Sequence, residues 1–179
     1  MSKMAEVQTH SIYATPEDFC AIFKENMEIL YSLALLLTGD PAIAEQCFLA
    51  ALGDCQDRPN VFPEWARSWS RRSIIKRAIR RMDPAGSFRA TAAIPEEFGD
   101  LEIPTRLTKL SLFERFVFAM TVLEGYSVRE CAVLLNCNPR EVEQTRIQAL
   151  RRIAGLNPAL ATAPRASGPQ VQSSLDNAA

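Results

Sequence analysis

The sequence predicts an all-α protein: two small helical domains joined by a flexible linker, the second domain a helix-turn-helix. Three observations predict this class. Apolar residues recur at spacings of three and four, which is the period of a helix with one buried face. Helix-start signals recur along the chain: a Ser, Thr, Asp or Asn precedes a proline, or stands three residues before a carboxylate. Convincing strand-like alternation is missing, and 179 residues suffice for two small cores.

The first domain is predicted over residues 16–82, after a mobile N-terminus at 1–15. Thr15-Pro16-Glu17-Asp18 supplies an N-cap hydroxyl, a proline at the first helical position and a carboxylate three residues after the cap. Apolar residues at helical spacing extend this helix to Leu37. Thr38-Gly39-Asp40-Pro41 then ends it and starts the next.

Two further helices complete the first domain. One is predicted from about Pro41 to Leu52, ending near Gly53, and the other from about Pro63 to Met82, ending before Asp83-Pro84. Because no strand pattern intervenes, this domain is predicted to be entirely helical.

The chain after residue 82 divides into three segments. Residues 83–105 are acidic and rich in Pro, Gly and small side chains, as expected of a linker. Residues 106–154 form the second domain, and 155–179 are predicted to be a disordered tail because little in them is apolar.

The second domain carries the same start signal three times. Each is a Ser or Asn followed three residues later by a glutamate. The pairs are Ser111 with Glu114, Ser127 with Glu130, and Asn138 with Glu141. They predict helices at about 112–124, 128–135 and 139–154, and the short turn Asn136-Cys137-Asn138 gives the last two the proportions of a helix-turn-helix.

Charge is distributed unevenly along the chain. The formal net charge is -1, yet residues 1–61 carry three basic and nine acidic groups, whereas residues 62–82 carry seven basic groups and one acidic group. Such a basic segment is suited to a polyanion.

The usual catalytic and metal-binding patterns are missing. His10 is the single histidine, and the five cysteines contain no Cys-x-x-Cys pair, so neither a zinc site nor a His-dependent nucleophile is easily built. Free, buried thiols are the prediction. We therefore predict no enzyme activity, catalytic residue, metal or cofactor. The sequence also has no membrane span and no secretory signal, so a cytoplasmic location is expected.

The second helix of a helix-turn-helix enters the DNA major groove with its early residues facing base edges. Arg140 is suited to guanine and Gln144 to adenine, with Thr145 and Arg146 beside them. These four are the predicted duplex-DNA contacts. The alternative is a protein-binding three-helix bundle in which Ala132, Leu135, Val142, Ala149 and Ile153 are simply core.

The basic helix interleaves cations with indole rings. Its predicted contacts to melted DNA are Trp65, Trp69, Arg71, Arg72 and Lys76, since basic side chains follow a phosphate backbone and indoles stack on unpaired bases. The alternative is that both tryptophans are core and the arginines pair with the acidic first domain.

Two segments carry a family resemblance. LALLLTGDPAIAEQCFLAAL (33–52) and LSLFERFVFAMTVLEGYSVRECAVLLNCNPREVEQTRIQALRRI (110–153) resemble the second and fourth conserved regions of extracytoplasmic-function (ECF) sigma factors, bacterial proteins of the sigma-70 family. The resemblance implies one domain at the polymerase clamp and the melted minus-ten element, and another at the flap and the minus-thirty-five element. It implies core RNA polymerase and promoter DNA as partners, an anti-sigma factor as a further candidate partner, and Glu45 and Gln46 as polymerase contacts.

Three functional hypotheses follow. The leading one is a transcription initiation protein that directs core RNA polymerase to particular promoters. The second is a sigma-like decoy that binds an anti-sigma factor or another regulator, motivated by the largely apolar run at 47–51 and by Glu141 and Glu143 in the recognition helix. The third is a stand-alone DNA-binding repressor.

Overall fold

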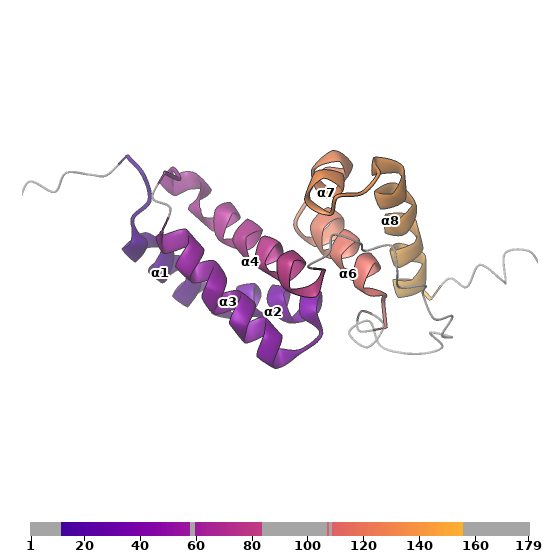
Figure 1. Cartoon of the computed structure of the whole chain (residues 1–179), viewed down its shortest axis with the longest axis horizontal. Helices are drawn as coiled ribbons and strands as arrows, with labels where there is room; N and C mark the ends of the chain where they lie inside the picture. Colours follow the sequence, from indigo (N-terminus) through magenta and orange to yellow (C-terminus); the bar gives the residue numbers. More distant parts are fainter. Residues whose placement is uncertain (1–11, 58–59, 84–106, 108, 156–179) are drawn as a thin grey trace, which may run out of the picture.

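The computed structural model describes residues 12–57, 60–83, 107 and 109–155 (Figure 1). Within these ranges the regular elements are helices and no strand is present, which confirms the all-α class. The predicted linker at 83–105 and tail at 155–179 lie outside the described residues except for Asp83 and Gly155. The predicted mobile N-terminus at 1–15 lies outside them up to residue 11, and it is wrong for Ala14, which is buried and donates its N–H to the Val61 carbonyl at 2.7 Å. In chain order the elements are α1 (Pro16–Glu25), α2 (Met27–Thr38), α3 (Pro41–Gln56), η1 (Pro63–Trp65), α4 (Ala66–Met82), α6 (Leu112–Phe118), η3 (Ala119–Leu123), α7 (Val128–Leu134) and α8 (Pro139–Ile153).

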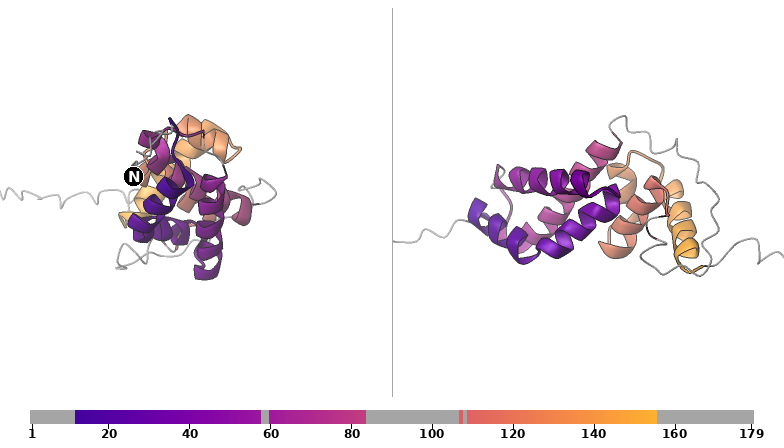
Figure 2. Two further views of the ribbon diagram at one scale, coloured as in Figure 1. Left: turned by 90° about the vertical axis from the view of Figure 1, so that its left-hand side faces the viewer. Right: turned by 90° about the horizontal axis from the view of Figure 1, so that it is seen from below.

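The helices form two adjacent groups (Figure 1). In the N-terminal bundle, α1 to α4, the helix α4 packs along α3 and contacts α1 and α2. In the C-terminal bundle, α6 to α8, the helix α8 packs against α6 and α7. The bundles also touch, because α2 contacts α6 and η3, and the right-hand view of Figure 2 shows them side by side.

The predicted helix starts are confirmed in atomic detail. At α1 the Thr15 hydroxyl accepts from the Asp18 N–H at 3.2 Å, and the Thr15 N–H donates to the Asp18 carboxylate at 2.8 Å. Each helix of the C-terminal bundle begins with the same reciprocal pair, on the residues that the sequence marks. Local hydrogen bonds that satisfy otherwise unpaired N–H groups therefore fix where these helices begin.

The first predicted helix is wrong in one respect, because the structure divides it at Asn26. The Asn26 side chain donates to the Ile22 carbonyl at 2.8 Å, and its backbone N–H reaches the same carbonyl at 3.0 Å. Asparagine competes with the helix for backbone groups in this way. The backbone leaves the helical region at Asn26 (φ -111°, ψ 23°), and α2 begins at Met27.

Two predicted helix ends also need correction. The helix predicted to end near Gly53 continues to Gln56, since burial of Ala51 and Cys55 holds its last turn in place. The helix predicted over 112–124 ends as the π-helical turn η3, in which the Glu124 N–H donates to the Ala119 carbonyl at 3.0 Å. The turn after it uses Gly125 in the left-handed region, with φ +69°.

Most buried apolar side chains form one cluster that crosses from one bundle into the other. Its large members are fully buried, and loss of apolar area is the main force stabilising such a core. They include Phe19, Leu30, Leu37, Ile74 and Ile75 of the N-terminal bundle and Phe116, Met120, Leu135 and Val142 of the C-terminal bundle.

Three glycines offer a matched test of backbone strain. Gly39 and Gly125 have φ of +70° and +69°, but a Cβ at Gly39 would overlap the Arg115 guanidinium, whereas one at Gly125 meets nothing within 4 Å. We expect Gly125→Ala to lower the free energy of unfolding by about 1 kcal/mol through strain alone, and Gly39→Ala by about 2 kcal/mol. Gly53→Ala, inside a helix with open space around it, should raise it by about 0.5 kcal/mol. Urea unfolding monitored by circular dichroism measures all three, and equal values for Gly39→Ala and Gly125→Ala would contradict the role of Arg115.

Candidate nucleic-acid interface

Helices α7 and α8 form the predicted helix-turn-helix. Asn136 takes a left-handed conformation in the turn (φ 49°), and Asn138 caps α8 by accepting from the Arg140 N–H at 2.8 Å. The Glu141 carboxylate accepts from the Asn138 N–H at 3.0 Å. Glu141 therefore secures the start of the recognition helix.

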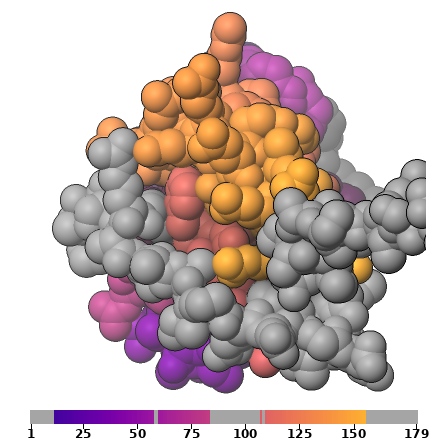
Figure 3. Space-filling model, turned by 90° about the vertical axis from the view of Figure 1, so that its right-hand side faces the viewer, coloured from indigo at the N-terminus to yellow at the C-terminus, as the bar shows by residue number. Residues whose placement is uncertain are grey.

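Figure 3 shows the end of the molecule at which α7 and α8 lie, and the outer face of α8 is largely polar. Arg140 and Gln144 are exposed, as are residues on the same face one and two turns further along. We call the exposed residues Arg140, Gln144, Ile147, Gln148 and Arg151 the recognition stripe. Sequence reasoning missed Gln148 and Arg151, although their spacing from Arg140 signals a shared face.

The other two predicted duplex contacts lie off this stripe. Thr145 is buried, with 9% of its surface exposed, on the inner side of α8. Arg146 is half-buried and donates to Glu143 at 2.7 Å, in an ion pair one turn apart. This pair offsets the negative charge that Glu143 brings close to the recognition stripe.

Four predicted melted-strand residues share one face of α4. Spacings of three and four place Trp65, Trp69, Arg72 and Lys76 on one side, together with the exposed Arg80. Trp65 is 60% exposed, and the Lys76 ammonium lies 5.5 Å from the centre of the half-buried Trp69 ring. We call these five residues the open face of α4. A flat ring beside cations is chemically suited to an unpaired base and its phosphates.

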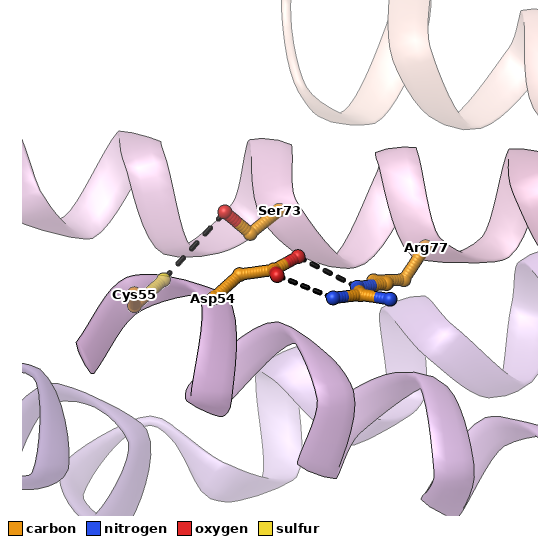
Figure 4. Close-up of polar contacts among 4 residues, drawn as sticks. All are labelled: Asp54, Cys55, Ser73 and Arg77. Atoms are coloured by element: carbon orange, nitrogen blue, oxygen red, sulfur yellow. Dashed lines mark hydrogen bonds and ion pairs between the residues drawn. The ribbon is translucent and has the colours of Figure 1, made fainter. Parts of the chain in front are cut away.

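Two other arginines of α4, Arg67 and Arg77, pair with carboxylates of the N-terminal bundle. Arg67 contacts Glu25 at 3.5 Å, and Arg77 forms a two-armed pair with Asp54 next to the Cys55–Ser73 contact (Figure 4). Asp54 raises the pKa of Arg77 through this hydrogen bond. The alternative interpretation of the basic helix is therefore correct for Arg67 and Arg77, which pair with the acidic N-terminal bundle.

An aromatic row that the sequence did not reveal extends from the open face of α4. The Phe62 ring lies 5.3 Å from Tyr13 and 5.6 Å from Trp65, edge-on to the indole. All three rings are exposed. Only the three-residue spacing of Phe62 and Trp65 hints at this row, since Tyr13 comes from a distant part of the chain.

A groove separates α4 from the turn before α7. It has a volume of about 630 Å³ and is lined by Trp65, Arg71, Arg72, Glu124, Tyr126 and Glu130, among others. Hydrogen bonds from Ser127 lower the pKa of Glu130, and Arg72 contributes in the same direction. Burial raises the pKa of Tyr126, and Arg72 opposes that shift. Arg72 thus lies close to the Glu130 carboxylate and the Tyr126 phenol, which line the same groove.

The predicted polymerase contacts lie on α3. Glu45 and Gln46 are both exposed, and Leu49, one turn further along, is 57% exposed. A groove of about 250 Å³ beside Gln46 is lined by Cys47 and Ala50 of α3 and by the arginines Arg77, Arg80 and Arg81 of α4. This surface therefore combines polar, apolar and cationic groups.

All five cysteines are free, but the prediction that they are buried is wrong for Cys20, which is exposed, and for Cys137, which is half-buried. Cys20 lies on the outer side of α1, where its sulfur accepts from the Gln56 amide at 3.1 Å. Cys47, Cys55 and Cys131 are buried. Within the described residues, no group of three or more His, Cys, Asp or Glu side chains is arranged to hold a metal ion.

The thiols should react in the order of their exposure. Burial raises the pKa of Cys131 to about 11, so at pH 8 only about one molecule in a thousand carries the reactive thiolate there. We expect Cys20 to react first with a disulfide reagent at pH 8, and Cys131 to stay protected until pH approaches 11. Mass spectrometry of the labelled peptides measures this order, with a urea-unfolded control in which all five react. Early labelling of Cys131 would contradict its burial.

The fold is that of an all-α protein whose C-terminal bundle contains a helix-turn-helix with a solvent-exposed outer face on α8. Residues 100–153 match the protein family described as Sigma-70, region 4, a non-enzymatic domain of transcription factors, over less than a third of the chain. The match supports a sigma factor-like, DNA-binding role and a place in the sigma-70 family. A comparison with curated proteins found no match. In the part of the chain that the structure describes, no helix is long and apolar enough to cross a membrane.

Proposed function

We propose that this chain is an ECF-type sigma factor of bacteria that acts in the cytoplasm, binds core RNA polymerase and directs it to specific promoters. The observation that carries the proposal is the region 4 match over 100–153, on a helix-turn-helix whose outer face presents Arg140 and Gln144 to solvent. The division into domains at 16–82 and 106–154 belongs to the same proposal.

Each domain has a separate part in this function. The C-terminal bundle captures duplex DNA with its recognition stripe, where Arg140 reads guanine and Gln144 reads adenine. The open face of α4, joined by Arg71, holds the melted strand through stacking and phosphate contacts. Glu45 and Gln46 on α3 bind the polymerase. Thr145 is left out of the proposed contacts because its side chain is buried, and Arg146 acts through Glu143.

The direct test is a titration of the full chain against core RNA polymerase. An assay of promoter strand opening follows, with every variant compared at the same salt concentration. We expect saturable binding and strand opening. Replacing Arg72 and Lys76 with alanine should impair opening about tenfold or more while leaving duplex capture largely intact. Replacing Arg140 and Gln144 should weaken duplex capture about tenfold or more. Equal loss of both activities in both variants would contradict this division of labour.

The decoy remains a second candidate because Leu49 exposes an apolar side chain on the proposed polymerase-binding helix. Leu49→Glu discriminates between the two hypotheses. If the parent chain does not bind polymerase and Leu49→Glu does, the chain is a decoy that has lost the polar polymerase-binding surface of α3. Tight promoter binding without any polymerase would instead favour a repressor.

A further inference from the structure

One apolar side chain lies in the middle of the recognition stripe. Arg140, Gln144, Ile147 and Arg151 follow one another at intervals of four, three and four residues, so they form a line along the outer side of α8. Ile147 is 41% exposed, and the other three side chains of this line are exposed and polar. The line therefore contains one side chain that has no hydrogen-bonding group.

The packing of the bundle does not account for an isoleucine at this position. The buried side of α8 is formed by Val142, Thr145 and Ala149, which lie on the opposite side of the helix from the recognition stripe. Isoleucine also has a lower helix propensity than the glutamine and arginine residues around it, because its branched side chain loses rotamer freedom in a helix. Ile147 becomes fully buried only when a ligand covers the recognition stripe.

The major groove of duplex DNA offers one kind of apolar group to such a side chain. Among the four bases, thymine alone presents a methyl group there, at C5, whereas the other base edges present hydrogen-bond donors and acceptors. Arg140 and Gln144 are suited to those donors and acceptors, and Ile147 is suited to the methyl group. Against a polar base edge, the isoleucine would displace water without replacing its hydrogen bonds, which is unfavourable. The side chain therefore favours thymine over the other bases.

We propose that Ile147 is a specificity-determining residue that reads the C5-methyl group of a thymine in the duplex bound by α8. The inference rests on the proposed duplex-DNA role of the recognition stripe and adds one base to it. Because an α-helix rises about 1.5 Å per residue, Ile147 lies about 10 Å along α8 from Arg140. Successive base pairs are about 3.4 Å apart. The thymine therefore lies within about three base pairs of the guanine that Arg140 reads.

The test uses the full chain and duplex DNA selected for binding from a random pool, with and without core RNA polymerase. Each thymine of the selected site is replaced in turn by deoxyuridine, which forms the same base pair and lacks only the methyl group. We expect one replacement to weaken binding by the parent about three- to fivefold, as the loss of one buried methyl group requires. Ile147→Ala should bind the thymine site more weakly and should not respond to that replacement. Fluorescence anisotropy at one salt concentration measures these affinities.

Leu150→Ala is the matched control on the same helix. Leu150 is 42% exposed, almost as much as Ile147, but its position in the helical repeat places it to one side of the line from Arg140 to Arg151. This variant should keep the parent's response to deoxyuridine. Circular dichroism checks that both variants remain folded.

The failure of this inference and the failure of the proposed function give different results. An equal response of the parent and Ile147→Ala at every thymine, or a selected site without a thymine, would overturn the role of Ile147 and leave duplex binding intact. If no duplex sequence is selected, either with or without core RNA polymerase, the proposed function is contradicted and the inference falls with it.

Discussion

Replacing Glu114 with alanine is expected to lower the free energy of unfolding of the C-terminal bundle by about 3 kcal/mol. Glu114 is buried, with 4% of its surface exposed, and performs two functions there. Its carboxylate accepts from the Ser111 N–H at 2.9 Å to start α6, and it lies 3.0 Å from Arg152 Nη1 at the other end of α8. Glu114→Ala removes the cap of α6. It also removes the carboxylate that pairs with Arg152, whose side chain is only 27% exposed.

Glu114→Gln separates these two functions. Glutamine is accepted at this position of a capping box, so this variant keeps most of the cap while losing the ion pair. We expect it to cost about half as much as Glu114→Ala in urea unfolding. A loss below about 1 kcal/mol for alanine would show that the Glu114–Arg152 contact contributes little.

Leu37→Ala should destabilise the N-terminal bundle by about 3 to 4 kcal/mol. Leu37 is fully buried in the shared core, and removing its side chain costs transfer free energy and leaves a cavity that the packed helices only partly fill. Alanine has a slightly higher helix propensity than leucine, but this gain is small, so the loss of packing dominates. Thermal unfolding followed at 222 nm measures the effect.

Leu49→Ala is the matched control on the neighbouring helix. The chemical change is identical, but Leu49 is 57% exposed, so we expect a change within about 0.5 kcal/mol. Similar losses at Leu37 and Leu49 would mean that the described packing of α2 is incorrect.

The sequence predicts the positions of helix starts well because those signals are local. Thr15, Ser111, Ser127 and Asn138 each act on a group two or three residues away, so a single chain contains the whole interaction. Helix interiors and ends are harder to predict. Asn26 interrupts a continuous apolar pattern, and Gly53 is retained in α3 because its neighbours pack against α4.

The candidate site is less predictable than the fold, since it depends on contacts between distant residues. The helical period explains why Arg140 and Gln144 share an exposed face, and equally why Thr145 faces inward. Sequence alone does not indicate that Arg71 turns to Glu124 while Arg72 stays on the open face of α4. Such pairing is decided by how the two bundles pack.

The contact between α2 and α6 has a consequence for the order of folding during synthesis. Helices α1 to α4 leave the ribosome before α6, and the chain from Asp83 to Leu112 takes about 2 to 6 s to translate at ordinary rates. Throughout that interval the side of α2 that α6 later covers has no partner from the C-terminal bundle. We expect the nascent N-terminal bundle to be most prone to chaperone binding and aggregation in this window, and a pause in translation after Met82 should make both more pronounced.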